Sequence, residues 1–416
     1  MTVGVDLRIF QIGHQYRGIG AHISNLFREF AKMKDLPNFV FFEHPNVDSG
    51  LDVIKEYLPK FNYEVRHTNI RLVGETYLQR EWASFKQRNI DGDAGLKDLS
   101  GIDILLSIDF NLGVPKPSKI KTVLISYDMI PWVLSETYLP NFSQTYKRTK
   151  NIKRATKATI DKKLYFHKFK QANRRAHKIL AISEHTKNDI TKYLHIKPKK
   201  IETILLGIDP SKARKQKETI STKRVTGKAT TFSTKKNPYV FFMGGADRRR
   251  RIEDLVKAFD AYAQSDKDFH LLLAGYDFQA LETVPDETAR NAIINAKNKD
   301  RILFAGFISD EERSALFACA QAFVFPSVYE GFGLPILEAM NLNCPVITYK
   351  NSSITEVGGD AVLYADGSED IENHIRSLMT NDELRHDLLN KGQEKVKEFS
   401  WEKTAQTTLK ALTSIN

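Results

Sequence analysis

The sequence is poor in cysteine and has no long apolar run, and each absence narrows the class of protein. Its 416 residues include two cysteines, Cys319 and Cys344, both in apolar segments. This usage predicts a protein without disulfides, as is typical of the cytoplasm. No uninterrupted apolar stretch reaches about 18 residues, so no transmembrane helix is predicted. The opening Met1–Asp6 is typical of a strand and not of a secretory signal. We therefore expect a cytoplasmic location.

Metal-binding patterns are also missing. The only Asp-x-Asp sequence, Asp91-Gly92-Asp93, lies in a polar stretch with no apolar strand before it. Carboxylates that hold Mg²⁺ or Mn²⁺ together with a diphosphate are expected at the end of a strand. The sequence has no cluster of cysteine and histidine either. It therefore predicts no metal site.

Basic residues exceed acidic ones, 62 against 51, which gives a net charge of +11. Much of the excess lies between Tyr146 and Lys178, where 13 basic residues stand with one acid, Asp161. Apolar side chains are interleaved at Tyr146, Leu164, Tyr165, Phe166 and Phe169. Such a tract at 146–178 can lie on an anionic membrane surface. A solvated helix face and a nucleic-acid surface are the alternatives. No nucleic-acid-binding motif accompanies the charge, so we expect no nucleic acid as partner.

Short apolar runs alternate with helical segments along the chain, which indicates a parallel α/β architecture in two domains. The first series of predicted strands is Val3–Ile9, Phe39–Glu43, Ile102–Ser107, Thr122–Tyr127 and Lys178–Ile182, with helices at Gly20–Met33 and Tyr77–Lys86. The second is Val240–Met243, His270–Ala274, Ile302–Ala305, Ala322–Phe325 and Val346–Tyr349, with helices at Glu253–Gln264, Asp310–Cys319 and Pro335–Asn341. Two successive Rossmann-like sheets are implied.

The boundary between the two domains falls in residues 207–238, which are rich in Lys, Thr and Ser and lack a steady apolar period. We predict a linker or an exposed excursion there, between domains at 1–206 and 239–398. The last segment, 399–416, is predicted to be a helix anchored by Trp401. It packs either on the second domain or back on the first.

The most informative segment is residues 323–340, where an apolar strand is followed by a glycine-rich turn and then by a helix opened by Pro335. The backbone amides of the turn, Gly331, Phe332, Gly333 and Leu334, can bind a phosphate at the helix N-terminus. Glu330 ends the strand and Glu338 lies about one turn into the helix, so both carboxylates can accept hydrogen bonds from sugar hydroxyls. An ordinary βαβ turn would explain the glycines alone. We therefore predict a nucleotide-sugar site.

This segment resembles the Glu-x7-Glu signature of family 4 (group 1) of the retaining glycosyltransferases, and the resemblance extends over nearly the whole chain. It implies the GT-B fold, in which two Rossmann-like domains face a central cleft and a C-terminal helix returns to the first domain. The first domain would bind the acceptor and the second the nucleotide diphosphate sugar, with no cofactor and no metal. In the family pattern, Glu330 would bind sugar hydroxyls and take part in catalysis, and Glu338 would bind the ribose.

A second anion site is predicted at Gly244-Gly245-Ala246-Asp247, followed by four arginines, 248–251. Cations at the N-terminus of a helix oppose its macrodipole, and a bound polyanion would resolve that conflict. The segment resembles the family's Gly-Gly-x-Asp-x-Arg-Lys-Asn sequence, which holds the donor diphosphate. Arg249 matches the family Arg and Arg250 stands where Lys is usual, so both are predicted catalytic cations. A solvated basic turn is the alternative, and it fits Arg248 best.

The first domain offers weaker candidates. In the loop Gly13–Gly20, the resemblance places Arg17, Gly18 and Gly20 near the donor phosphates, with a plain tight turn as the alternative. Tyr127 stands where relatives have His, and it is a cleft candidate that could stack or donate a hydrogen bond. Asp128 is a catalytic or acceptor-contact candidate, with a capping role in a turn as its alternative. Ser183 is a cleft residue or a helix cap.

The loop Ala305–Ser309 corresponds to the base-binding loop of the family, which makes Phe307 and Ile308 donor-binding candidates. The resemblance thus implies a retaining transferase that moves a sugar to a glycan or a lipid-linked acceptor in cell-surface polysaccharide assembly, peripheral on the inner face of the membrane. A soluble transferase for a protein or small-molecule acceptor and a catalytically silent scaffold subunit remain as alternatives.

Overall fold

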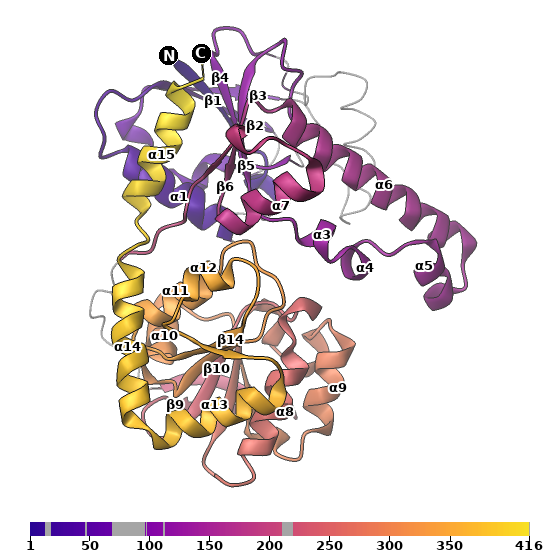
Figure 1. The fold of residues 1–416 in the computed structure, drawn as a ribbon, viewed down its shortest axis with the longest axis vertical. Coiled ribbons are helices and arrows are strands. Elements are labelled where there is room, and N and C mark those ends of the chain that lie inside the picture. Colours follow the sequence, from indigo (N-terminus) through magenta and orange to yellow (C-terminus); the bar gives the residue numbers. More distant parts are fainter. Residues whose placement is uncertain are drawn as a thin grey trace. The chain divides into compact units, whose positions relative to one another are not determined.

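The computed structural model describes residues 1–12, 18–45, 48–68, 96, 98–110, 113–209 and 219–415. The chain forms two compact units, which we call the first and the second domain (Figure 1). The first comprises Met1–Gly207 and Ser400–Asn416, and the second Ile208–Phe399. The predicted helix Tyr77–Lys86 and the Asp91-Gly92-Asp93 sequence lie outside the described residues, as does Arg17.

Over its described residues, the sheet of the first domain has seven parallel strands in the order β3-β2-β1-β4-β5-β6-β7. The strands are β1 Thr2–Asp6, β2 Asn38–Glu43, β3 Tyr63–His67, β4 Ile104–Ser107, β5 Lys121–Ser126, β6 Lys178–Ala181 and β7 Ile201–Thr203. The central strands are nearly continuous apolar runs because helices cover both faces of a parallel sheet. The strand order reverses between β1 and β4, which is the switch point where α/β folds bind ligands.

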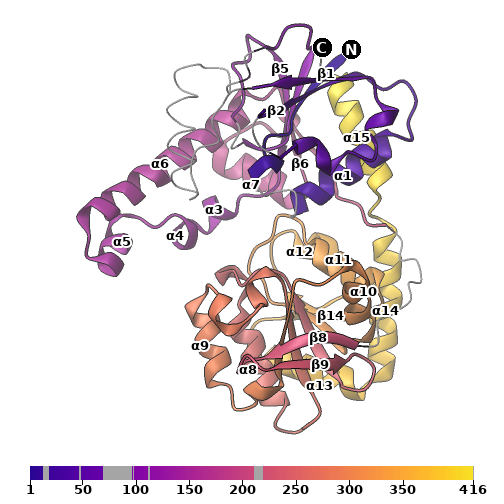
Figure 2. The ribbon, with the colours of Figure 1, turned by 180° about the vertical axis from the view of Figure 1, so that it is seen from behind.

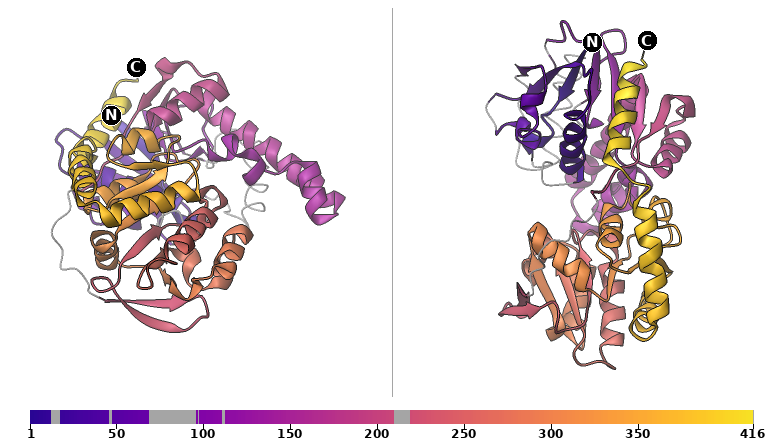
Figure 3. Two further views of the ribbon diagram at one scale, coloured as in Figure 1. Left: turned by 60° about the horizontal axis from the view of Figure 1, so that its bottom comes forward. Right: turned by 90° about the vertical axis from the view of Figure 1, so that its left-hand side faces the viewer.

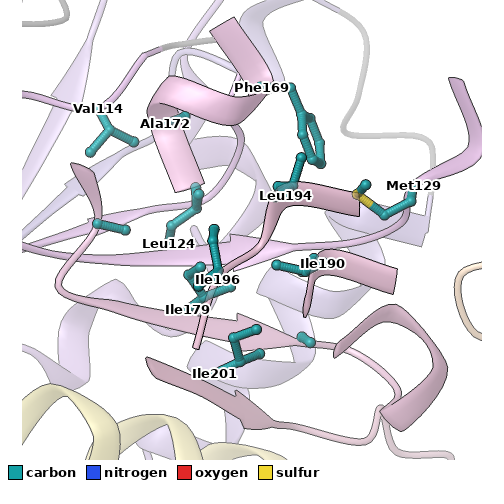
Figure 4. Packing of buried hydrophobic residues seen from close by; sticks show 12 residues of the cluster. Val114, Leu124, Met129, Phe169, Ala172, Ile179, Ile190, Leu194, Ile196 and Ile201 are labelled. Carbon is teal, nitrogen blue, oxygen red and sulfur yellow. The ribbon is translucent and has the colours of Figure 1, made fainter. Parts of the chain in front are cut away.

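Before its C-terminal segment, the described part of the first domain contains the helices α1 Gly18–Phe30, α3 Ile130–Val133, α4 Ser135–Tyr138, α5 Phe142–Thr149, α6 Ile152–Arg175 and α7 Glu184–Leu194. The inner half of α6 and the helix α7 cover one face of the sheet (Figure 4). There Phe169 packs against Phe110 with 4.6 Å between ring centroids, and Phe166 packs against Trp132 at 4.3 Å. Tyr165 is only 6% exposed. Tyr165 and Phe169 are thus part of the domain's own packing and do not serve as the membrane anchors that the sequence pattern suggested.

The second sheet has eight strands within the part of the domain that the structure describes, in the order β15-β14-β13-β10-β11-β12-β8-β9. The parallel strands are β10 Tyr239–Met243, β11 His270–Ala274, β12 Ile302–Gly306, β13 Ala322–Phe325, β14 Val346–Tyr349 and β15 Leu363–Ala365. An antiparallel hairpin of β8 Thr219–Arg224 and β9 Ala229–Ser233 extends the sheet beyond β12 (Figure 2; right view of Figure 3). The sequence predicted no strands in 207–238. Only a few side chains of the hairpin, such as Ile220 and Phe232, are buried, so its apolar pattern is weak.

The helices of the second domain are α8 Ile252–Tyr262, α9 Glu287–Asn295, α10 Asp310–Cys319, α11 Leu334–Asn341, α12 Ile354–Gly358, α13 Ser368–Thr380 and α14 Asp382–Val396. Pro335 occupies the second position of α11, because Gly333 ends the turn and Leu334 is the first helical residue. No helix among the described residues is long and apolar enough to cross a membrane.

The C-terminal helix α15, Trp401–Thr413, packs on α1 of the first domain, so the alternative place on the second domain is excluded. Trp401 is 5% exposed and stacks on His22 with 6.0 Å between ring centroids. A Cβ atom on Gly207 would lie 2.1 Å from the backbone nitrogen of Trp401. Glycine is therefore required where the two chain segments of this domain pass each other.

Candidate active site

The predicted donor residues gather at the switch point of the second sheet. From β10 the chain moves to β11 and β12 on one side, and then returns to β13, which pairs with the other edge of β10. Loops that leave the carboxyl ends of β10 and β13 consequently lie next to each other, although they are about 80 residues apart in the sequence. The loop after β10 carries the arginines, and the loop after β13 carries Glu330.

The arginines form a short 3-10 turn, Arg248–Arg250, before α8 begins. Asp247 caps this turn, since its carboxylate accepts a hydrogen bond from the amide of Arg249 at 3.1 Å. Arg251 adopts a left-handed conformation with φ 47° and pairs with Asp254 at 2.9 Å in the first turn of α8. Acids therefore occupy the N-terminus of α8, as its macrodipole favours. Arg248 is exposed.

Arg249 and Arg250 converge on Glu330. Arg249 Nη2 lies 3.1 Å from Glu330 Oε2, and Arg250 Nε lies 3.4 Å from Oε1. Ser327 Oγ donates a hydrogen bond to the same carboxylate at 2.9 Å. The three charged side chains are only 10–17% exposed. We call Arg249, Arg250 and Glu330 the arginine–glutamate cluster. Its carboxylate supplies part of the counter-charge that the sequence pattern assigned to a bound polyanion.

The cluster is held from several sides. Val328 donates its amide hydrogen to the carbonyl of Arg249 at 2.8 Å, which joins the two loops. Arg250 donates to the carbonyl of Gly245 at 3.2 Å and lies 5.4 Å from the ring centroid of Phe325. Burial lowers the pKa of Arg250, although the neighbouring Glu330 opposes that shift. Arg250 is thus fixed by packing rather than extended into solvent.

Glycine is needed beside Arg250. Gly244 has φ +146°, and a Cβ atom there would lie 2.2 Å from Arg250 Nη1. Gly275, at the end of β11, has φ +136° and approaches so closely that its Cβ would lie 2.1 Å from the Gly244 carbonyl oxygen. These glycines let the guanidinium lie against the backbone. The amide of Ala246 donates to the Asp277 carboxylate at 2.8 Å, a partner that the sequence analysis missed.

The glycine turn after β13 leads into α11 without a side-chain cap. Gly333 has φ +111°, stands at the N-cap and has no side chain that could bind the first amides of the helix. Phe332 is buried and packs edge-on against Phe399 at 5.8 Å. The backbone of Glu330 is held by Ser352 and Ser353, at 3.0 and 2.8 Å. This arrangement orients the turn while leaving the helix N-terminus without a carboxylate or hydroxyl from the N-cap residue.

Glu338 pairs with an arginine on α10, whereas Glu330 pairs with the arginines that follow β10. The Glu338 carboxylate lies 3.6 Å from the guanidinium of Arg313 on α10. Burial raises the pKa of Glu338, and Arg313 opposes that shift. Sequence analysis did not single out Arg313, whose only sequence signal is its place in the helix after the predicted base-binding loop.

Two exposed aromatic residues mark the carboxyl ends of β11 and β12. Tyr276 is 78% exposed and Phe307 is 80% exposed. The amide of Gly275 donates to the Gly306 carbonyl at 2.7 Å, which ties the two loops together. Phe307 and the half-buried Ile308 were candidates from the sequence, whereas Tyr276 was missed. An exposed aromatic residue in the loop after a buried strand is the signal that would have found it.

Candidates in the first domain lie at the carboxyl ends of its strands, mostly in structural contacts. Asp128 accepts a hydrogen bond from the amide of Ile130 at 2.8 Å, which is a turn contact, since the N-cap residue of α3 is Met129. Ser183 is fully buried and caps α7 through the amide of Thr186 at 3.0 Å. Gly18 and Gly20 lie in the first turn of α1. Their proposed ligand contacts remain predictions.

Tyr127 is paired with a histidine that the sequence analysis did not single out. The Tyr127 hydroxyl lies 2.9 Å from His22 Nδ1 on α1. His22 is fully buried, and its Nε2 atom has no hydrogen-bond partner among the described residues. Burial lowers the pKa of His22 to about 3. The ring is therefore neutral in the folded protein, and its contact with the Tyr127 hydroxyl helps to fix the position of that side chain.

We expect His22 to make the first domain labile to acid. The unfolded histidine has its ordinary pKa of 6.5 and binds a proton below it, whereas the folded one does so only near pH 3. The stability contribution is thus complete above pH 6.5 and is lost as pH falls. His22→Gln should flatten this decline by about 1.4 kcal/mol per pH unit between about pH 6 and 4. Urea denaturation at several pH values tests this, with the exposed His386→Gln as control. Equal slopes for both variants would contradict it.

Part of the chain matches a known protein family. Residues 226–395 match the family described as glycosyl transferases group 1. The O-antigen chain mannosyltransferase B of Escherichia coli is 33% identical over 176 residues, which cover 42% of this chain and 45% of the relative. The serotype-specific mannosyltransferase WbdA of the same species is 25% identical over 299 residues, covering 71% of this chain and 34% of WbdA. The chain thus spans less than half the length of these relatives.

Solved structures show the fold over the whole chain. Anabaena Alr3699/HepE, crystallised in complex with UDP and glucose, superposes with a TM-score of 0.64 at 13% identity and full coverage of both chains. WaaG, a glycosyltransferase involved in lipopolysaccharide biosynthesis, gives 0.61 at 12% identity, again with full coverage.

Two Rossmann-like domains, with the terminal helix on the first, place the protein in the GT-B fold class, as predicted. Residues 226–395 are similar to the group 1 glycosyltransferases. Among the described residues, no group of three or more His, Cys, Asp or Glu side chains could hold a metal ion.

Proposed function

We propose that the protein is a retaining glycosyltransferase that moves a hexosyl group from a nucleotide diphosphate sugar to a hydroxyl of a lipid-linked glycan. The observation that carries the proposal is the arginine–glutamate cluster at the switch point of the second sheet. Two fixed guanidiniums stand beside an uncapped helix N-terminus, which suits a diphosphate. One carboxylate between them suits sugar hydroxyls.

The reaction breaks the bond between the sugar C1 and the diphosphate oxygen, and the bonding electrons stay on that oxygen. The acceptor hydroxyl forms the new C1–O bond on the same face of the sugar, and its proton passes to the departing diphosphate. Arg249 and Arg250 would stabilise the growing negative charge, which is the largest contribution a fixed site can make. Glu330 would hold the sugar in position while the bonds change.

The exposed rings of Tyr276 and Phe307 suit the base of the nucleotide. They follow β11 and β12, one and two strand spacings from the arginines after β10, or about 5 and 10 Å. A nucleoside diphosphate is long enough to extend over this distance, from its phosphates at the cluster to its base at the aromatic pair. Tyr276 and Phe307 would then stack on the base or shield it from water.

The acceptor class rests on the relatives. They include O-antigen mannosyltransferases and a Campylobacter jejuni enzyme that acts on a diphospho-undecaprenol-linked sugar, 25% identical over 240 residues. Mannose is therefore the first sugar to test, and a polyprenyl diphosphate glycan the first acceptor. A soluble acceptor and a catalytically silent subunit are the competing functions.

A panel of nucleotide sugars separates these functions. The expected result is thermal stabilisation by one nucleotide sugar, slow hydrolysis of that donor, and sugar transfer to a short polyprenyl diphosphate glycan. Stabilisation without any turnover would identify a silent binding subunit. Transfer to a free sugar or peptide, but not to the lipid-linked acceptor, would favour the soluble function. No response to any nucleotide sugar would contradict the proposal as a whole.

Glu338→Gln should weaken donor binding about 10- to 150-fold, because losing one hydrogen bond to a charged group costs about 1.5–3 kcal/mol. The change keeps the size of the side chain and removes the charge that pairs with Arg313. Donor kinetics and melting temperature are measured together, with the exposed Glu369→Gln as control. Unchanged donor kinetics in the folded variant would mean that Glu338 only holds α10 against α11 through Arg313.

A further inference from the structure

A helical hairpin projects from the first domain. It consists of α5, the turn at Lys150 and Asn151, and the outer part of α6, and we call residues 141–160 the arm (Figure 1; left view of Figure 3). Asn141 and Asn151 cap the two helices, and Lys150 makes the turn in a left-handed conformation with φ 51°. These caps fix where both helices begin, so the arm is an ordered part of the fold.

The arm has its small side chains inside and its large apolar ones outside. Only Thr145 and Ala155 are buried in it, at 6% and 0% exposure. The large apolar residues are exposed instead: Phe142 41%, Tyr146 39%, Ile152 63% and Ile160 40%. A helix that serves the core of its own domain has the opposite pattern. These four side chains therefore suit a surface outside the protein.

The exposed apolar residues are ordered on each helix. Ile152, Thr156 and Ile160 are four residues apart and share one face of α6. Together with Lys153 and Lys157 they line an open hollow of about 430 Å³. On α5, the rings of Phe142 and Tyr146 stack at 6.0 Å. Each helix thus presents an exposed stripe of apolar side chains, which Thr156 interrupts on α6.

The charge of the arm has one sign. Residues 141–160 contain six basic side chains and no acid: Lys147, Arg148, Lys150, Lys153, Arg154 and Lys157. Such a surface repels a second copy of itself, which argues against pairing between arms. It attracts anions, and the apolar stripes require that the anionic surface also accepts hydrocarbon. A phospholipid bilayer with anionic headgroups meets both conditions.

The base of the arm is fixed to the domain. Tyr165 and Phe169, further along α6, pack on Phe110 at 5.4 and 4.6 Å. Because α6 is one helix from Ile152 to Arg175, this packing holds the outer half as well. The arm can therefore transmit a membrane contact to the first domain without a hinge.

We propose that the arm docks the first domain on an anionic lipid surface, with Phe142, Tyr146, Ile152 and Ile160 entering the headgroup region and the six cations contacting lipid phosphates. The proposal goes beyond glycosyl transfer and stands without it, because lipid binding is measured with no donor or acceptor present. It keeps Tyr146 from the sequence-based expectation for 146–178, but its other anchors are Phe142, Ile152 and Ile160 and not the residues at 164–169.

The test is sedimentation of the full chain with vesicles of phosphatidylcholine alone or with about one third phosphatidylglycerol. The wild type should bind the anionic vesicles, and binding should weaken as salt rises, because charge is screened over about 8 Å at physiological ionic strength. Changing Lys147, Arg148, Lys153 and Arg154 to Gln should weaken binding about 100-fold or more. Ile152→Ser with Ile160→Ser should weaken it about tenfold while the net charge is unchanged.

A matched control carries the same charge change elsewhere. Lys236, Lys257, Lys267 and Lys297 are exposed on the second domain, and changing all four to Gln should leave vesicle binding as in the wild type. Tyr146→Trp should be quenched by a brominated lipid if the arm enters the headgroup region. Equal recovery on neutral and anionic vesicles, equal loss in the control variant, or an unquenched tryptophan would overturn the proposal. Concentration-dependent self-association that the Ile152/Ile160 variant abolishes would also overturn it.

Discussion

Arg250→Ala should lower donor turnover by about 100- to 1,000-fold at saturating donor, the cost of removing one group that stabilises charge in a transition state. Arg250 is held against Glu330, the Gly245 carbonyl and Phe325, so its charge is placed before the reaction begins. A fixed cation needs no reorganisation when the diphosphate departs. The measurement is the initial rate of sugar transfer or donor hydrolysis.

Arg248→Ala is the matched control for this prediction, since it removes the same charge two residues away. Arg248 is exposed, and surface changes alter free energies by about 0.5 kcal/mol, so the rate should change about twofold. Arg250→Lys should recover part of the lost rate, because the charge returns without the guanidinium fork. A larger loss for Arg248→Ala than for Arg250→Ala would show that the diphosphate is bound by a different face of the turn.

Glu330→Gln should distinguish two roles of Glu330, its contact with the sugar and its compensation of the charge of the arginines. Two effects are expected together: loss of a carboxylate contact to sugar hydroxyls, and loss of one counter-charge of Arg249 and Arg250, of which Arg249 keeps Asp247 at 2.9 Å. The first should reduce use of the nucleotide sugar about 10- to 150-fold. The second should lower the free energy of unfolding by about 2 kcal/mol, because both guanidiniums stay buried beside an uncharged side chain. The hydroxyl of Ser327 can still donate a hydrogen bond to the oxygen of the new side-chain amide at position 330.

The free nucleoside diphosphate provides the sharpest readout for Glu330. In the wild type, Glu330 competes with the diphosphate for the two arginines, and Gln does not. Glu330→Gln should therefore bind the nucleoside diphosphate at least as tightly as the wild type, while the nucleotide sugar turns over slowly. Calorimetry with both ligands tests this, with Glu369→Gln as control. Parallel weakening of both ligands would mean that Glu330 acts mainly by holding the loop in shape.

The predicted strands show how much of the fold can be predicted from a local sequence pattern. Apolar runs predicted β10 to β14 closely, because a buried parallel strand is apolar along its whole length. Strand Val3–Ile9 was predicted too long: β1 ends at Asp6, whose carboxylate pairs with Arg8, and Leu7 to Ile9 are buried outside the strand. Burial alone does not distinguish a strand from a buried loop that follows it.

The hairpin β8–β9 and the anchors at 165–169 show where local pattern failed. The hairpin joins the sheet by backbone pairing with β12, and that pairing needs few apolar side chains. Tyr165 and Phe169 have the same residue types as membrane anchors, but Phe110 from a distant loop covers them. A sequence pattern identifies side chains that seek an apolar partner, but not which partner they meet.

By itself the sequence determined the two Rossmann-like sheets, the glycine turn that opens α11 and the presence of cations after β10, because each depends on residues close in the chain. Tertiary structure alone decided that Arg249 and Arg250 meet Glu330, that Glu338 meets Arg313, and that a buried His22 supports Tyr127. These partners come from loops and helices far apart in sequence. Strand order and helix packing bring them together, and no local pattern encodes either.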